Sequence, residues 1–172
     1  MAVTDHIRTL RPLSELDYHD SRSILLPGPI TALDAWNFIT QETGPLMRLA
    51  FKTRDAVSAL FGVKRIGGFS GKRLESVQAG DRLDFFVVES SAPDRLILTN
   101  RDRHLDVMIC LSIMDRLLTV TASVVTHNAF GRLYMLPVGL VHKLILRGDL
   151  RRLQRRLART GQASLPAPGT GA

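Results

Sequence analysis

The feature that most constrains this chain is a long C-terminal stretch, residues 133–159, whose apolar pattern changes halfway along. Its first half, residues 136–146, is apolar on nearly every side of a helix. Its second half has one apolar stripe surrounded by arginines, formed by Leu146, Leu150, Leu153 and Leu157. A helix that is apolar all round must be enclosed, whereas a helix with one stripe lies on a surface. We therefore expect the first half to be wrapped by other elements and the second half to emerge from them.

The middle of the chain supplies strands that could wrap this helix. Strands are predicted over residues 83–88, 95–101, 105–113 and 118–124, with turns at 90–94, 102–103 and 115–116. The third strand has the clearest pattern, because five apolar residues alternate strictly: Leu105, Val107, Ile109, Leu111 and Ile113. Successive strands joined by tight turns imply an antiparallel meander, which needs a cover on one face. The C-terminal helix is long and apolar enough to provide that cover.

The first third of the chain predicts one strand and two short helices. Residues 1–19 are expected to form an irregular arm, and residues 23–26 a strand that prolines end. Thr31 or Asp34 can cap the first helix, whose inward positions include Leu33, Trp36 and either Phe38 or Ile39. A second helix is expected over residues 46–60, followed by a glycine-rich loop at 66–71.

The C-terminal helix has two predicted boundaries. Asn128 is expected to cap a short first turn, and the main helix to begin close to Pro137, because proline is tolerated near a helix start. The Gly/Pro/Ala-rich residues 160–172 are expected to be a disordered tail. Together these patterns predict a single α+β domain over residues 20–159, between the arm and the tail.

The positive charge of the chain is concentrated at one end. Of 23 bases and 16 acids, seven bases and one acid lie in residues 143–172, which leaves 16 bases and 15 acids elsewhere. One interpretation is a solvated helix face whose cations lie near the negative end of the helix dipole. The alternative is a surface for anionic lipid or nucleic acid. Nucleic acid is the weaker partner, because no aromatic residue lies among these arginines to stack on bases.

The rest of the composition favours a soluble cytoplasmic protein. The single cysteine, Cys110, excludes an internal disulfide framework and is typical of a reducing compartment. Residues 1–11 lack the apolar core of a signal peptide. The longest apolar run, residues 133–146, contains His142 and Lys143 and is shorter than the ~20 residues of a membrane helix, so no integral membrane segment is expected.

Four segments carry a resemblance to a known family: residues 103–107 (RHLDV), 125–128 (VTHN), 130–134 (FGRLY) and 136–142 (LPVGLVH). With the order of elements, they make the chain over about residues 20–157 resemble the START-like (SRPBCC) superfamily, in particular an uncharacterised bacterial branch of domains of unknown function. The resemblance implies a helix-grip fold, in which a curved antiparallel sheet wraps a long C-terminal helix and leaves a cavity for a hydrophobic or amphipathic small molecule. Related domains stand alone or follow a nicotinamide-binding reductase domain, which suggests a functional link to a reductase.

Four residues are candidates for acid–base chemistry: His127, Tyr134, His104 and Asp106. His104 and Asp106 lie two apart in a strand and share a face, so Asp106 could tune the histidine, or the two could belong to ion pairs on an outer face. His127 and Tyr134 flank the hinge before the last helix, which by the resemblance lies at a cavity end. They could polarise a carbonyl there or simply hold the turn.

Six residues are expected to line a ligand cavity, although the same positions suit plain core: Trp36, Phe51, Phe85, Tyr134, Val141 and Ile145. Arg48, Lys52 and Arg54 could meet an anionic head group or form a solvated face. No metal is expected, because the histidines show no tight pairing, and no cofactor is expected.

These patterns lead to three functional hypotheses. The first is binding of a hydrophobic or amphipathic small molecule between the sheet and the C-terminal helix. The alternative is a cyclase or dehydratase that uses the same cavity. The third is an adaptor that acts through the arginine-rich helix end. The ligand, any reaction and the oligomeric state do not follow from the sequence.

Overall fold

The structure is a computed structural model, and it describes residues 6–41, 44–45, 47–49, 51–52, 55 and 67–163, with side chains as far as residue 159. In chain order its elements are the 3₁₀ helix η2 (Leu13–Glu15), β1 (Tyr18–Leu25), α1 (Ala32–Gln41), β2 (Arg82–Leu83), β3 (Phe86–Ala92), β4 (Arg95–Arg101), β5 (Leu105–Met114), β6 (Leu117–Thr126) and α3 (Ala129–Ala163).

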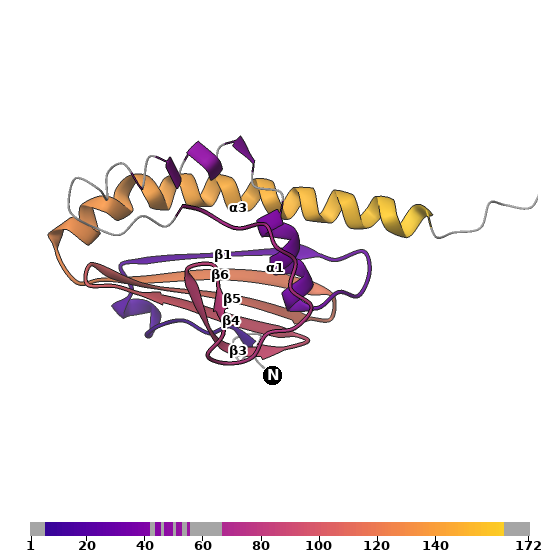
Figure 1. The fold of residues 1–172 in the computed structure, drawn as a ribbon, viewed down its shortest axis with the longest axis horizontal. Helices are drawn as coiled ribbons and strands as arrows, with labels where there is room; N and C mark the ends of the chain where they lie inside the picture. Colours follow the sequence, from indigo (N-terminus) through magenta and orange to yellow (C-terminus); the bar gives the residue numbers. More distant parts are fainter. Residues whose placement is uncertain are drawn as a thin grey trace, which may run out of the picture.

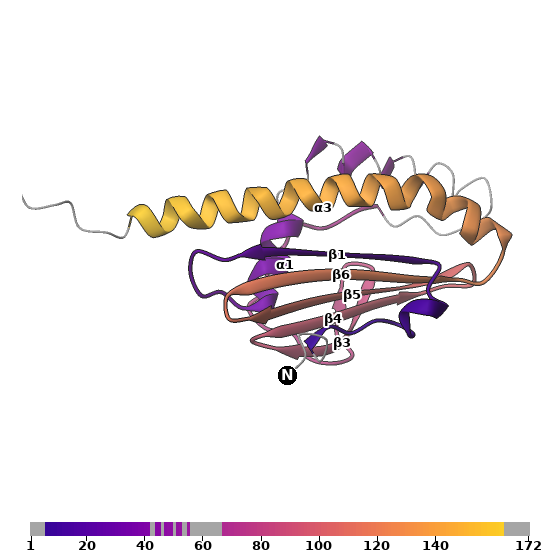
Figure 2. The same cartoon turned by 180° about the vertical axis from the view of Figure 1, so that it is seen from behind.

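The strands form one curved antiparallel sheet with the order β1-β6-β5-β4-β3-β2. Figures 1 and 2 show α3 lying along one side of this sheet, close to β1, with α1 beside it. The predicted α+β class, the antiparallel meander and the long C-terminal helix are confirmed.

Helices α1 and α3 cover the same face of the sheet. Helix α1 packs over β4 and β5, while α3 packs mainly over the edge strand β1 and contacts α1. Their shared core joins the apolar face of the strands to the stripe on α3, with Leu98, Leu111, Leu118, Leu150 and Leu153 fully or almost fully buried. The predicted stripe on the second half of α3 is therefore confirmed as the face that packs on the sheet.

The opposite face of the sheet is covered by the N-terminal arm. The backbone N–H of Leu10 donates to Ser123 Oγ at 3.1 Å, and Cys110 Sγ lies 3.9 Å from the carbonyl oxygen of His6. The arm is shorter than predicted, because β1 begins at Tyr18, which pairs with Val124 across the sheet.

Three of the predicted strands correspond to β4, β5 and β6, whereas one contains a turn. Residues 83–88 divide into β2 and β3 at Asp84-Phe85, where Asp84 adopts a φ of 54°. The predicted turn at Asp115-Arg116 is confirmed, and both residues have positive φ. The apolar residues on either side of Phe85 and Phe86 give the same hydrophobic pattern for one continuous strand as for two strands joined by a turn. The pattern therefore did not reveal the β2–β3 turn.

Helix α1 has the predicted start. Thr31 Oγ accepts the backbone N–H of Asp34 at 3.0 Å and donates to Asp34 Oδ2 at 2.8 Å, so both predicted capping residues take part. Leu33 and Trp36 are buried as expected. The second predicted helix, over residues 46–60, lies largely outside the described residues, although those described between 45 and 55 have helical geometry.

Helix α3 begins and ends beyond its predicted boundaries. Asn128 is the cap, as expected, since its side-chain oxygen accepts the N–H of Gly131 at 3.0 Å. The helix does not begin at Pro137 but continues through it from Ala129, and it ends at Ala163 rather than before residue 160. Pro137 lacks an N–H and breaks one hydrogen bond, and the axis bends in these first turns (Figure 1).

The predicted enclosure of the first half of α3 is wrong. Leu133, Leu136, Leu140 and Leu144 are exposed, and the buried side chains begin at Ile145 and Leu146. Among the described residues, the segment Ala129–Arg159 is long and apolar enough to cross a membrane, and 22% of its most apolar window is buried.

Candidate functional site

Five aromatic side chains form a cluster beside the β2–β3 turn. Phe69 lies at the centre, with ring centroids 5.2 Å from Phe51, 5.3 Å from Phe85 and 5.5 Å from Trp36. Phe86 completes the cluster, 5.6 Å from Trp36 and 4.5 Å from Phe85. Most of these pairs meet edge to face, the arrangement that aromatic quadrupoles prefer.

The loop that carries Phe69 is fixed to α1 and to the β2–β3 turn. The buried Asn37 side chain donates to the Leu74 carbonyl at 2.8 Å and accepts the Leu74 N–H at 3.2 Å. The N–H of Ser70 donates to Asp84 Oδ1 at 2.9 Å. Asp55 Oδ2 accepts the N–H of Gly67 at 2.9 Å. The loop therefore holds Phe69 in place through backbone groups, without secondary structure of its own.

A pocket of about 270 Å³ lies against this cluster. Phe51 and Phe69 form its aromatic side, and its other lining residues are Arg48, Lys52, Asp55, Gly67 and Gly68. Its volume is near the lower end of the ~300–1,000 Å³ of small-molecule sites. Two cations and one carboxylate line it, and the carboxylate is already engaged by the Gly67 N–H. The pocket therefore combines an apolar surface with excess positive charge.

The six predicted lining residues separate into two groups. Phe51 lines the pocket, and Trp36 and Phe85 pack behind it in the aromatic cluster. Tyr134, Val141 and Ile145 lie on α3 and do not line it. Phe69 was missed because it lies in a glycine-rich loop with no periodicity. Arg48 and Lys52 line the pocket and are exposed, which fits both predicted roles, an anion contact and a solvated face. Arg54 lies outside the described residues.

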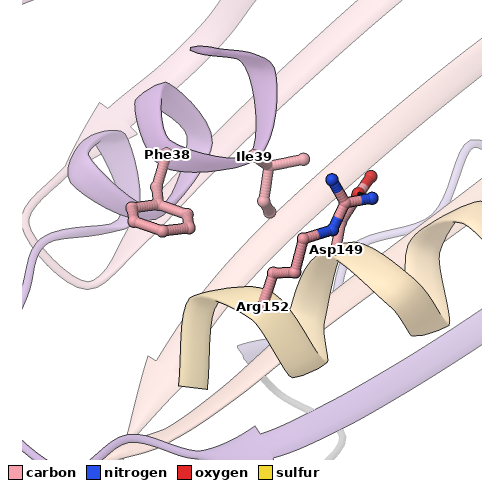
Figure 3. A pocket seen from close by; sticks show the side chains of 4 residues that line it. All are labelled: Phe38, Ile39, Asp149 and Arg152. Atoms are coloured by element: carbon pink, nitrogen blue, oxygen red, sulfur yellow. Dashed lines mark hydrogen bonds and ion pairs between the residues drawn. The ribbon is translucent and has the colours of Figure 1, made fainter. Parts of the chain in front are cut away.

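The place where α1 meets α3 is filled rather than hollow. Figure 3 shows Phe38 and Ile39 of α1 facing Asp149 and Arg152 of α3. The space between these four side chains is too small for a water molecule. Arg152 Nη2 donates to Asp149 Oδ1 at 2.9 Å. Burial raises the pKa of Asp149 from 3.8 to about 6, against the opposing effect of the Arg152 guanidinium.

The four predicted acid–base residues lie at the junction between β6 and α3, but in different pairs from those expected. Asp106 Oδ1 lies 3.1 Å from His127 Nε2 rather than next to His104. His104 Nε2 accepts from Arg103 at 2.9 Å, and its Nδ1 lies 3.4 Å from the Asn128 side-chain oxygen. The ring of Phe130 lies between His104 and Tyr134, with centroids 4.8 Å and 6.3 Å away.

These contacts connect the helix cap to the sheet. The His127 N–H donates to the His104 carbonyl at 2.8 Å, and that carbonyl lies against Gly131 so closely that no Cβ would fit there. None of the four candidates lines the pocket at Phe51 or the space at Asp149. Of the contacts that the structure gives them, the His127 N–H bond is one that holds the turn, and the Asp106–His127 pair is an ion pair when the histidine is protonated. Among the described residues, no group of three His, Cys, Asp or Glu side chains is placed to bind a metal.

The contact between β1 and the first half of α3 is polar. Tyr18 Oη donates to the Gly139 carbonyl at 3.2 Å and lies 3.5 Å from His142 Nδ1. The buried Asp20 accepts two bonds from Arg22, at 3.1 and 3.2 Å. Burial raises the pKa of Tyr18 to about 12, and burial lowers that of His142 although Asp20 opposes the shift.

The fold and this pocket define an α+β protein in which a six-stranded antiparallel sheet is covered by a short helix and a long C-terminal one. The chain belongs to the family described as protein of unknown function DUF2867, which matches residues 12–149. No curated protein matches the chain. The family match includes the sheet, the pocket residues and the first half of α3.

Proposed function

We propose that this protein binds a small amphipathic anion in the pocket at Phe51 and Phe69. The observation that carries the proposal is a pocket of about 270 Å³ with an aromatic side and two basic side chains, Arg48 and Lys52. The apolar part of the ligand would lie on the phenylalanine rings and its anionic group near the two cations.

The resemblance to START-like proteins supports binding over other functions, because it implies a hydrophobic or amphipathic ligand. The proposed position differs from the one that the resemblance implies, since the pocket lies at the aromatic cluster and not between the sheet and α3. Catalysis has less support, because no acid–base candidate lines the pocket. A reductase as functional partner and a cytoplasmic location remain predictions from the sequence.

The first experiment is native mass spectrometry of the purified protein, which detects small molecules that remain bound. A retained anionic or amphipathic compound is the expected result. The second is calorimetric titration with 1-naphthoate and with its uncharged counterpart 1-naphthylmethanol. We expect tighter binding of the carboxylate, because only the carboxylate can pair with the cations.

Two substitutions and one control locate the site in this titration. Lys52→Gln should weaken binding of 1-naphthoate about three- to tenfold, since one charge-assisted contact of a partly solvated lysine is lost. Phe51→Ala should weaken both probes. Lys72→Gln, at an exposed lysine on the neighbouring loop, should leave both affinities unchanged. Equal binding of the two probes, or an unchanged affinity in Lys52→Gln, would refute the proposed site.

A further inference from the structure

The outer face of the first half of α3 consists of leucines. Leu133, Leu136, Leu140 and Leu144 are 67%, 72%, 66% and 57% exposed. Their spacings of three, four and four residues place them on one side of the helix. A soluble domain rarely presents a continuous row of large apolar side chains without a partner for it.

The inner face of the same turns is held against β1. Tyr18 of β1 packs against Gly139, where an added Cβ would lie 2.8 Å from its ring, and Lys143 Nζ lies 5.7 Å from the centre of that ring. This part of α3 therefore has a large apolar surface on the side away from the sheet, where an ordinary surface helix is polar. Because the inner side of these turns already contacts β1, only their outer side is available to bind a partner.

The leucine row continues along α3 as an arginine row. Arg147, Arg151 and Arg155 follow Leu144 at spacings of three and four residues, and all three are exposed. From Leu133 to Arg155 the face is about 33 Å long at 1.5 Å per residue. The one acid among the described residues after Leu144 is Asp149, which is buried on the opposite side of the helix. The second half of the face is thus positive, and among the described residues of α3 no carboxylate lies on the same side of the helix.

We infer that this leucine–arginine face of α3 docks on the surface of a membrane that contains anionic phospholipids. The leucines would enter the boundary between head groups and acyl chains, and the arginines would bind lipid phosphates. Charge complementarity favours this partner, because such a membrane offers an apolar layer to the leucines and phosphates to the arginines. A second copy of the chain would bury the leucines but would place no anion against the arginines. Nucleic acid would neutralise the arginines but would leave the leucines in water.

A helix that spans the bilayer fits the structure less well than one that lies on its surface. The inner side of α3 is joined to the sheet through Tyr18, Leu150 and Leu153. A span would have to break these contacts and bury His142 and Lys143 in hydrocarbon. Docking by the outer side leaves the fold unchanged.

The test is co-sedimentation of the full chain with vesicles of phosphatidylcholine alone and of phosphatidylcholine with one quarter phosphatidylglycerol, at low and high salt. We expect binding to the anionic vesicles at 0.1 M salt, weaker binding at 0.5 M, and little binding to phosphatidylcholine alone. The double variant Leu136→Glu/Leu140→Glu should bind the anionic vesicles roughly a hundredfold less, while its melting temperature stays near that of the wild type because both positions are exposed.

One further variant tests the arginine half of the face, and another is a control outside it. Arg147→Gln/Arg151→Gln should weaken binding to anionic vesicles by about fivefold for each arginine removed. Leu13→Glu is the matched control. Leu13 is 63% exposed, similar to the leucines of the face, but it lies in η2 and not on α3. It should bind like the wild type.

Three outcomes would overturn the inference. The first is equal binding to the two kinds of vesicle, and the second is wild-type binding by the Leu136→Glu/Leu140→Glu variant. The third is a dimer in sedimentation velocity that this variant abolishes, without vesicle binding by the wild type, which would assign the face to a second copy. Titration with 1-naphthoate should give the same affinity in this variant and the wild type, so the docking face and the ligand pocket are tested independently.

Discussion

Asp149 is a carboxyl group that the fold removes from water at the contact between α1 and α3. It is 6% exposed, and its ion pair with Arg152 does not fully offset the cost of burial, so its pKa rises from 3.8 to about 6. The folded state therefore keeps a proton on Asp149 at pH values where the unfolded state has lost it. The stability that comes from this tighter binding of the proton is fully present below about pH 4, and it is lost as the pH rises through about 6.

Asp149→Asn should remove that pH dependence. We expect the variant to be more stable than the wild type by about 1–3 kcal/mol at pH 7.5, and nearly equal to it at pH 4. Urea denaturation at the two pH values measures the difference. Asp94→Asn, at an exposed aspartate in the β3–β4 turn, should show no such gain. Equal stability of Asp149→Asn and wild type at pH 7.5 would contradict the assigned cost of burial.

Gly139 is a residue at which α3 lies close against β1. An added Cβ would lie 2.8 and 3.0 Å from two ring carbons of Tyr18, and the ring is held by its bond to the Gly139 carbonyl. Gly139→Ala should therefore destabilise the protein by about 1–3 kcal/mol. Gly148→Ala in the same helix is the control: a Cβ there meets only the end of the Arg152 side chain, at 3.9 Å, so a gain of about 0.5–1 kcal/mol is expected. Denaturant unfolding compares the two, and a Gly139→Ala variant at least as stable as the wild type would show that the ring can move.

At the scale of elements, α3 is fixed to the sheet at its start, at Gly139 and along its leucine stripe. The start depends on Asn128, whose oxygen accepts the Gly131 N–H and whose amide donates to the Arg103 carbonyl at 3.2 Å. The cap therefore connects the first turn of α3 to the loop before β5. The contacts of His104 and His127 reinforce the same junction.

Asn128→Ala should destabilise the protein by about 1 kcal/mol, because the first turn loses its cap. Asn128→Asp keeps an acceptor and adds negative charge at the positive end of the helix, so it should lose less stability than the alanine variant. Thermal unfolding followed by circular dichroism measures both. An alanine variant that unfolds at the wild-type temperature would mean that the junction contacts hold the turn without the cap.

At the scale of the whole molecule, the sheet has two covered faces of different character. The helices cover the apolar face, and the arm covers a face of hydroxyl and thiol groups that includes Thr121, Ser123 and Cys110, all buried. The thiol is fully buried, and burial raises its pKa. The burial of this thiol thus depends on the N-terminal arm.

Removal of residues 1–10 should make Cys110 reactive. We expect the thiol of the intact protein to react slowly with 5,5′-dithiobis(2-nitrobenzoate) under native conditions, and that of the shortened protein to react at least tenfold faster. Both should react equally fast in guanidinium chloride, which controls for the amount of thiol. An unchanged native rate after removal would show that another segment protects the thiol.

Local patterns predicted much of the meander and both helix caps. Alternation identified the strands that became β4, β5 and β6, because each has one face in the core, and side-chain chemistry identified Thr31 and Asn128. The pocket was predicted only in part, through Phe51 and the basic residues of its helix. Phe69 lies at the pocket because Asn37 and Asp84 form hydrogen bonds with the backbone of its loop. These two residues are distant from Phe69 in the chain, so no periodic pattern indicates the contact.

The amino-acid sequence alone determined that α3 would be long, apolar in its first half and striped in its second. Only the tertiary structure decided which side of the first half faces the sheet. Hydrophobicity could not choose, because residues 136–146 are apolar nearly all round. The side that faces the sheet is the one with Gly139, whose lack of a Cβ leaves room for the Tyr18 ring of β1. The leucines on the opposite side therefore point away from the sheet.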